Sequence, residues 1–184
     1  MKPSTAGSPA ASVSPFVRRL SRLRVPLGFA GSLCVAVLAS PTWTSLAWGA
    51  LVAALGEAIR MWASGHLEKG REVTQSGPYR WCAHPLYLGS SVIAVGLVIA
   101  ASSWWVALVA AAYMGTTIPA AIRSEEAELR AAFGDRYDAY RRGASTRVAR
   151  SFSPARAWRN REYRSVVGLV VGLAVLALKS AFGL

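Results

Sequence analysis

The stretch WTSLAWGALVAALGEAIRMWA, residues 43–63, decides the fold class of this chain. An α-helix needs about 20 predominantly apolar residues to cross the hydrocarbon core of a bilayer, with about 17 as a lower bound. Four further apolar runs occupy residues 25–40, 86–101, 104–122 and 166–182. The runs at 25–40 and 86–101 are short and need flanking residues to span. Because no run alternates with a period of two, we expect helices and not barrel strands.

The composition supports a membrane protein over a soluble one. The chain has 184 residues, of which 53% are hydrophobic and 16% charged, a smaller charged share than in soluble domains. Five buried helices of a soluble core are an alternative, but five such runs in so short a chain argue against it. We predict an all-α, polytopic membrane bundle of about five helices. Its expected parts are a disordered tail (1–15), the main domain (16–142), a basic linker (143–165) and an added C-terminal span (166–184).

The basic residues predict the orientation of these spans. The formal net charge is +12, and Arg18, Arg19, Arg22 and Arg24 precede the first run. Further Lys and Arg residues lie between the second and third runs and between the fourth and fifth, whereas the connections 40–42 and 102–103 are uncharged. Lys and Arg favour cytoplasmic loops. We therefore expect a multi-pass protein of the cell membrane with a cytoplasmic N-terminus, anionic lipids as its electrostatic partners, and no nucleic acid.

The sequence GPYRWCAHPLYLG, residues 77–89, is the first candidate site. Pro85 disfavours helical geometry at His84 and suits the first turn of a helix, so His84 is predicted at the start of the third span. The free N–H groups there attract anions such as a carboxylate. Tyr79, Trp81 and Tyr87 could stack on a purine or lie against a cation. The alternative is an interfacial aromatic belt with a capping histidine.

The sequence RSEEAEL, residues 123–129, is the second candidate site. The adjacent carboxylates of Glu125 and Glu126 could bind an ammonium group at the membrane surface. A solvated acidic turn paired with Arg123 and Arg130 is the alternative.

The sequence has two further polar features with a functional and a structural interpretation. Within the second run, Glu57 and Arg60 are either functional or paired, with each other or across the bundle. The two histidines, His66 and His84, lack the spacing of a zinc site, so no metal site is expected.

Together these residues resemble the superfamily of isoprenylcysteine carboxyl methyltransferases and phospholipid methyltransferases. The resemblance covers residues 55–142 and rests on five motifs in order: Gly56-x-x-x-Arg60-x-Trp62-Ala63, Gly77-Pro78-Tyr79, His84-Pro85-x-Tyr87-x-Gly89, Glu125-Glu126-x-x-Leu129 and Phe133-Gly134-x-x-Tyr137-x-x-Tyr140. The chain departs from the superfamily pattern at Ala83, where an arginine is usual. It departs again at residues 147–150, where Val-Pro-Arg is frequent.

The resemblance implies an enzyme that uses S-adenosyl-L-methionine to methylate a lipophilic acceptor at the cytoplasmic face. The acceptor would be an isoprenylcysteine-like carboxylate or a lipid head group. By the same resemblance, Arg123 lies near the acceptor as the catalytic candidate. The cofactor would be bound by residues at the cytoplasmic ends of the spans, namely Tyr79, His84, Pro85, Leu86, Tyr87, and Glu125 or Glu126.

Two other functions are alternatives to this one. Membrane sterol reductases, which use a nicotinamide cofactor, share a similar His-Pro-x-Tyr-x-Gly segment. They usually have an acidic residue soon after that glycine, where this chain has Ser90 and Ser91. A non-enzymatic small transporter or assembly protein would explain Glu57 within the membrane, but not the aromatic and acidic motifs.

Overall fold

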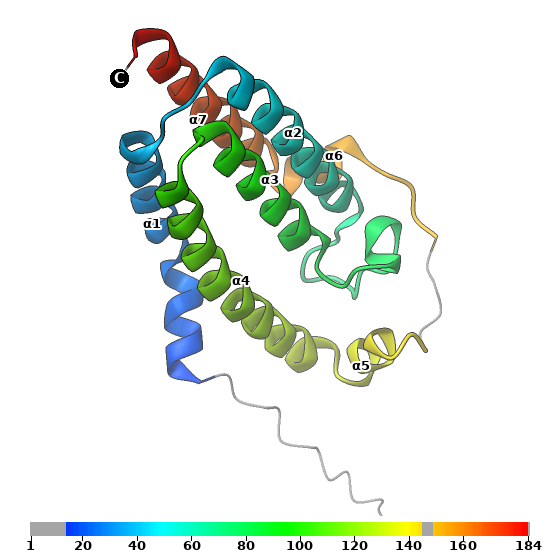
Figure 1. Ribbon diagram of the computed structural model, residues 1–184. Helices are drawn as coiled ribbons and strands as arrows, with labels where there is room; N and C mark the ends of the chain where they lie inside the picture. Colours follow the sequence, from blue (N-terminus) through cyan, green and yellow to red (C-terminus); the bar gives the residue numbers. More distant parts are fainter. Residues whose placement is uncertain (1–13, 145–148, 184) are drawn as a thin grey trace, which may run out of the picture.

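The computed structural model describes residues 14–144 and 149–183, and within these ranges the chain forms helices and no β-strand (Figure 1). The five long helices are α1 (Pro15–Leu38), α2 (Trp43–His66), α3 (Pro85–Ala101), α4 (Trp104–Phe133) and α7 (Tyr163–Phe182). Three short helices complete the fold: η1 (Gly77–Arg80), α5 (Asp135–Arg141) and α6 (Pro154–Arg159). The predicted all-α helix bundle is therefore confirmed.

Each predicted apolar run corresponds to one long helix. Among the described residues, α2, α4 and α7 are long and apolar enough to cross a membrane, and α3 is a shorter apolar helix of 17 residues. The helix α1 has 24 residues, but arginines occupy much of its first half. Residues 1–13 of the predicted disordered tail lie outside the described residues.

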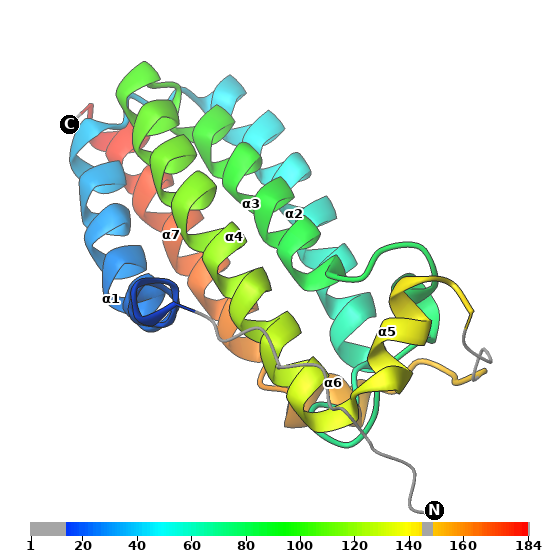
Figure 2. The same ribbon diagram turned by 90° about the horizontal axis from the view of Figure 1, so that it is seen from below.

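Glycines bring α2 and α3 into direct backbone contact, and the two helices lie antiparallel and side by side (Figures 1 and 2). A Cβ atom added to Gly56 would lie 2.8 Å from the carbonyl oxygen of Gly89 and 2.6 Å from a backbone nitrogen of α3. A Cβ atom on Gly96 would lie 2.7 Å from the carbonyl oxygen of Gly49 and 2.5 Å from the nitrogen of Ala53. Close backbone approach through small residues is a common way for membrane helices to associate.

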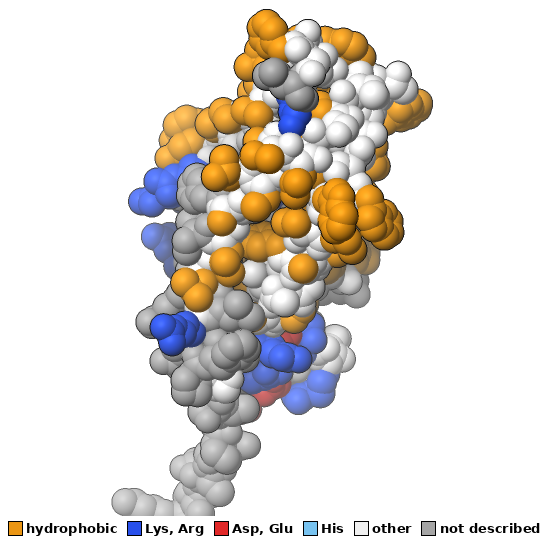
Figure 3. All heavy atoms as spheres, turned by 60° about the vertical axis from the view of Figure 1, so that its left-hand side comes forward, with side chains coloured by type: hydrophobic (Ala, Val, Ile, Leu, Met, Phe, Trp, Pro, Cys, Tyr) orange, Lys and Arg blue, Asp and Glu red, His pale blue; other side chains and the backbone are white. Residues whose placement is uncertain are grey.

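The two ends of the bundle differ in charge. One end, called the charged end below, contains the C-termini of α2 and α4, the N-termini of α3 and α7, and the loops between them. At the opposite end, the connections 39–42 and 102–103 are uncharged. Near that opposite end, Lys179 donates to the carbonyl oxygens of Ala36 and Val37. Figure 3 shows exposed apolar side chains over much of one face, with acidic side chains towards one end.

The length of α4 carries it past the C-terminus of α2 and the N-terminus of α3 at the charged end (Figure 1). Its 30 residues make a helix of about 45 Å, longer than the roughly 30 Å hydrocarbon core. The helix stops at Gly134, which has a positive φ of 49° and precedes α5. The last turns of α4 therefore lead into α5, which lies beside the loop at the charged end (Figure 2).

The glycine contact gives a direct test of this packing. We expect Gly56→Ala to lower the free energy of unfolding by about 1–3 kcal/mol, since its Cβ meets backbone atoms that cannot move aside. Gly115→Ala in α4 is the matched control, because nothing lies within 4 Å of its added Cβ. Thermal unfolding in detergent measures both, and equal melting temperatures for the two variants would contradict the close approach.

Candidate functional site

The two motifs singled out in the sequence meet at the charged end. Nε2 of His84 lies 3.2 Å from Oε1 of Glu126, and Nδ1 of the same ring lies 3.9 Å from Oε2 of Glu125. His84 precedes α3, whereas the two glutamates lie on the part of α4 that extends beyond the bundle. The structure therefore brings together groups that are about 40 residues apart in the sequence.

The geometry of His84 follows from the proline after it. His84 is the N-cap residue of α3, with φ −131° and ψ 60°, and Pro85 occupies the first turn as predicted. Its side chain makes no capping hydrogen bond to the helix and is 13% exposed. The ring instead contacts the carboxylates and lies 5.9 Å from the ring of Tyr87. The side chain of His84 therefore does not cap α3, which is the alternative given above.

The two adjacent carboxylates have different surroundings. Glu126 is 17% exposed, and its oxygens lie 3.5 Å from Arg130 and 3.4 Å from Arg141, in addition to the contact with His84. Glu125 is 43% exposed, and the contact of its carboxylate with a basic side chain in the described part of the chain is the 3.9 Å approach to His84. Glu126 is thus the centre of a charge cluster, whereas few positive groups lie near the carboxylate of Glu125.

Three tyrosines border this cluster. The hydroxyl of Tyr140 donates to the carbonyl oxygen of Tyr79 at 2.7 Å, which ties α5 to η1. Tyr79 and Tyr137 are buried, and among the described residues neither hydroxyl has a hydrogen-bond partner. Such unpartnered buried groups are rare in proteins, and each of these hydroxyls is available to bond a water or a ligand.

The phenols are neutral hydrogen-bonding groups at physiological pH. Burial, and after it the charge of Glu125, raises the pKa of Tyr79 far above its usual value. Burial raises the pKa of Tyr137 and of Tyr140 to about 12. These hydroxyls can therefore donate to a ligand, but they do not serve as bases.

The other predicted residues are placed less centrally. Pro85 is buried, and the carbonyl of Leu86 accepts a hydrogen bond from Arg60 at 3.4 Å. Arg123 is exposed and forms no ion pair among the described residues. Residues two apart on a helix do not face each other, so Arg123 and Glu125 point in different directions. The structure does not join Arg123 to the cluster around His84.

The polar residues of α2 are paired across the bundle and not with each other. Nε of Arg60 lies 2.8 Å from Oε1 of Glu162, and its Nη1 donates to the hydroxyl of Ser90 at 2.5 Å. Ser165 donates to Oε2 of Glu57 at 2.7 Å. Sequence reasoning missed Glu162 and Ser165, although Glu162 is the single acidic residue after Asp138 and lies four residues before the last apolar run.

The described residues contain no group of three or more His, Cys, Asp or Glu side chains arranged to hold a metal ion.

The fold and the site define a class: a membrane helix bundle with a histidine, two carboxylates and buried phenols gathered where its helices end. The chain belongs to the phospholipid methyltransferase family, whose model matches residues 29–136, more than half of the chain. The resemblance inferred from the motifs is thereby confirmed. Family membership supports methyltransferase activity in a membrane protein.

Two curated relatives are similar to parts of this chain. The nickel-cobalt-cadmium resistance protein NccN of Alcaligenes xylosoxydans xylosoxydans is 34% identical over 90 residues, 46% of this chain and 42% of that protein. The cobalt-zinc-cadmium resistance protein CzcN of Cupriavidus metallidurans is 34% identical over 97 residues, 50% of this chain and 45% of that protein. The chain thus spans less than half the length of these relatives. No solved structure matches it.

The unequal surroundings of the two glutamates predict unequal effects on stability. Glu126→Gln removes the charge that His84, Arg130 and Arg141 share, so we expect the free energy of unfolding to fall by about 1–3 kcal/mol. Glu125→Gln should change it much less, because that side chain is more exposed and makes one long contact. Denaturant or thermal unfolding in detergent compares the two, and equal losses would contradict the assignment of Glu126 as the centre of the cluster.

Proposed function

We propose that this protein transfers a methyl group from S-adenosylmethionine to a lipophilic acceptor, and that the charged end, where this occurs, faces the cytoplasm. The observation on which the proposal chiefly rests is the meeting of His84 with Glu125 and Glu126 beside two buried, unpartnered phenols. The family supplies the type of reaction. The gathering of Lys and Arg residues at one end supports the orientation.

The residues present fit the charges of the cofactor. Its amino-acid part has an ammonium and a carboxylate on one carbon atom, which suits an acceptor and a donor side by side. Glu125 has the less compensated carboxylate and would bind the ammonium. Nδ1 of His84, the ring nitrogen that Glu126 does not engage, would bind the carboxylate.

The aromatic residues suit the remainder of the cofactor. Tyr79 and Tyr87 offer ring faces for the adenine and for the positive sulfonium. The hydroxyls of Tyr79 and Tyr137 would gain the hydrogen-bond partners that the described residues do not supply. S-adenosylmethionine brings an activated methyl group, so alignment of cofactor and acceptor provides much of the rate gain.

The acceptor is proposed to be an apolar-tailed molecule that enters from the bilayer. Arg123 is exposed on α4, two residues before Glu125, and would attract an anionic head group such as a carboxylate. A carboxylate acceptor needs no proton removed, whereas a protonated amine must first lose one. Because their pKa values are raised, the tyrosines stay protonated and cannot accept that proton, which favours the carboxylate over a phospholipid amine.

Cofactor binding tests the proposed role of Glu125. We expect Glu125→Gln to weaken binding of S-adenosylhomocysteine by about 1.5–3 kcal/mol, the worth of a charge-assisted hydrogen bond. Glu128→Gln, the same change on the exposed side of the same helix, is the control and should bind as the unmodified protein does. Calorimetric titration measures each affinity. Equal, small effects from both variants would show that the acidic turn is only solvated.

The nature of the acceptor is tested by following the methyl group. The purified protein is incubated with methyl-labelled S-adenosylmethionine and either a membrane lipid extract or the aqueous metabolite fraction. We expect label in the lipid extract, and expect Arg123→Ala to reduce its rate of appearance by about tenfold or more while the affinity for S-adenosylhomocysteine is retained. Label found in aqueous products alone would refute entry from the bilayer, and a full rate in Arg123→Ala would remove Arg123 from the acceptor site.

A further inference from the structure

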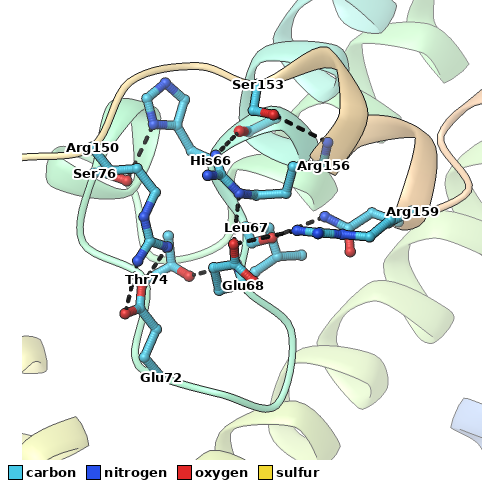
Figure 4. Close-up of polar contacts among 12 residues, drawn as sticks. His66, Leu67, Glu68, Glu72, Thr74, Ser76, Arg150, Ser153, Arg156 and Arg159 are labelled. Atoms are coloured by element: carbon cyan, nitrogen blue, oxygen red, sulfur yellow. Dashed lines mark hydrogen bonds and ion pairs between the residues drawn. The ribbon is translucent and has the colours of Figure 1, made fainter.

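A segment beyond the family-matched region packs on the charged end of α2. This bracing segment, residues 150–162, contains α6 and supplies donors to the last carbonyl groups of α2 (Figure 4). Asn160 Nδ2 donates to the carbonyl oxygens of Ser64 and Leu67, at 2.9 Å each. Arg156 Nη1 and the backbone nitrogen of Ser153 both donate to the carbonyl of Gly65. The last carbonyl groups of a helix lack N–H partners in the next turn, and those of α2 thus accept hydrogen bonds from a distant part of the chain.

The same segment holds the loop that follows α2. Arg156 Nε donates to Oε1 of Glu68 at 2.8 Å, and Arg150 Nη1 lies 2.6 Å from Oε1 of Glu72. Inside the loop, the backbone nitrogen of Glu68 donates to the hydroxyl of Thr74 at 3.1 Å (Figure 4). The hydrogen bond from Arg156 also holds the pKa of Glu68 below its usual value. The first half of the loop is therefore fixed to the bracing segment by ion pairs from Arg150 and Arg156.

The second half of the loop continues into the candidate site. Nδ1 of His66 lies 3.1 Å from the hydroxyl of Ser76, and the His66 ring packs against Gly77, where a Cβ would lie 2.5 Å from it. Gly77 has a positive φ of 58° and begins η1, which contains Tyr79. Residues 67–79 therefore form one short segment that starts at the contacts of Arg156 and ends at Tyr79, whose carbonyl accepts a hydrogen bond from Tyr140.

We propose that Arg156 is a positioning residue that sets the affinity of the site for its cofactor by fixing residues 67–79 against the end of α2. This rests on the proposed function, because it is the binding of S-adenosylmethionine that the fixed loop would favour. In the described contacts Arg156 touches none of the site residues around His84, so it acts through Glu68 and Gly65.

The chemistry of arginine explains why this position needs it. Its planar guanidinium offers several fixed donors, so one side chain can serve a carboxylate and a backbone carbonyl at once, which a lysine does poorly. The side chain of Arg156 is 14% exposed. Arg159 on the same helix approaches the same Glu68 oxygen at 3.5 Å, but it is 63% exposed and makes no backbone contact among the described residues. Arg159 is therefore a matched control.

Hydrogen exchange and cofactor affinity together test the inference. We expect faster amide exchange over residues 67–79 in Arg156→Met than in Arg159→Met. We also expect Arg156→Met to weaken binding of S-adenosylhomocysteine by about tenfold, which corresponds to about 1.4 kcal/mol. Both are measured well below the melting temperature, so that a simple loss of folded protein does not mimic the result. The milder Glu68→Gln, which keeps a hydrogen-bond acceptor, should change both quantities in the same direction by less.

The outcomes separate this inference from the proposed function. If the unmodified protein does not bind S-adenosylhomocysteine, the proposed function is wrong. If it binds and Arg156→Met binds equally well, or if exchange over residues 67–79 is unchanged in Arg156→Met, the positioning role is wrong. Lowered melting temperature with unchanged affinity of the folded protein would show that Arg156 only stabilises the fold.

Discussion

The direct backbone contact between α2 and α3 is the constraint on which the rest of the structure depends. The pairs Gly49 with Gly96 and Gly56 with Gly89 fix the register of two antiparallel helices, since a side chain at these positions would force them apart. With that register set, Arg60 of α2 reaches the carbonyl of Leu86 and the hydroxyl of Ser90 in the first turns of α3. The end of α2 and the start of α3 therefore stay together, and His84 is held at the charged end.

The candidate site is formed by helix ends of unequal length. Because α4 is longer than the bilayer requires, its last turns extend past the start of α3 and place two carboxylates against His84. Glu126 is compensated by Arg130 and Arg141 and lies 3.2 Å from His84, and this arrangement lowers the electrostatic cost of a mostly buried carboxylate. Glu125, one residue earlier, remains largely uncompensated, so adjacent residues of one type differ in what they can bind.

Sequence reasoning predicted the features that follow from short-range rules. Apolar length located the five long helices, and Pro85 located the start of α3 and the place of His84. The order of the motifs predicted the family that residues 29–136 match. Sequence reasoning could not predict which residues pair across the bundle. Whether Glu57 and Arg60 paired with each other, or with Ser165 and Glu162 about one hundred residues away, depended on where α7 packs, which hydropathy does not encode. The predicted basic linker, residues 143–165, likewise contains α6, whose six residues are too few for a periodic pattern.

The account is tested most directly by asking which cofactor the unmodified protein binds. Purified protein in detergent is titrated calorimetrically with S-adenosylhomocysteine and, in parallel, with a reduced nicotinamide dinucleotide. The arrangement of His84, Glu125 and the unpartnered phenols predicts saturable binding of S-adenosylhomocysteine and none of the nicotinamide. Saturable binding of the nicotinamide alone would favour a membrane reductase and would contradict the methyltransferase assignment of this site.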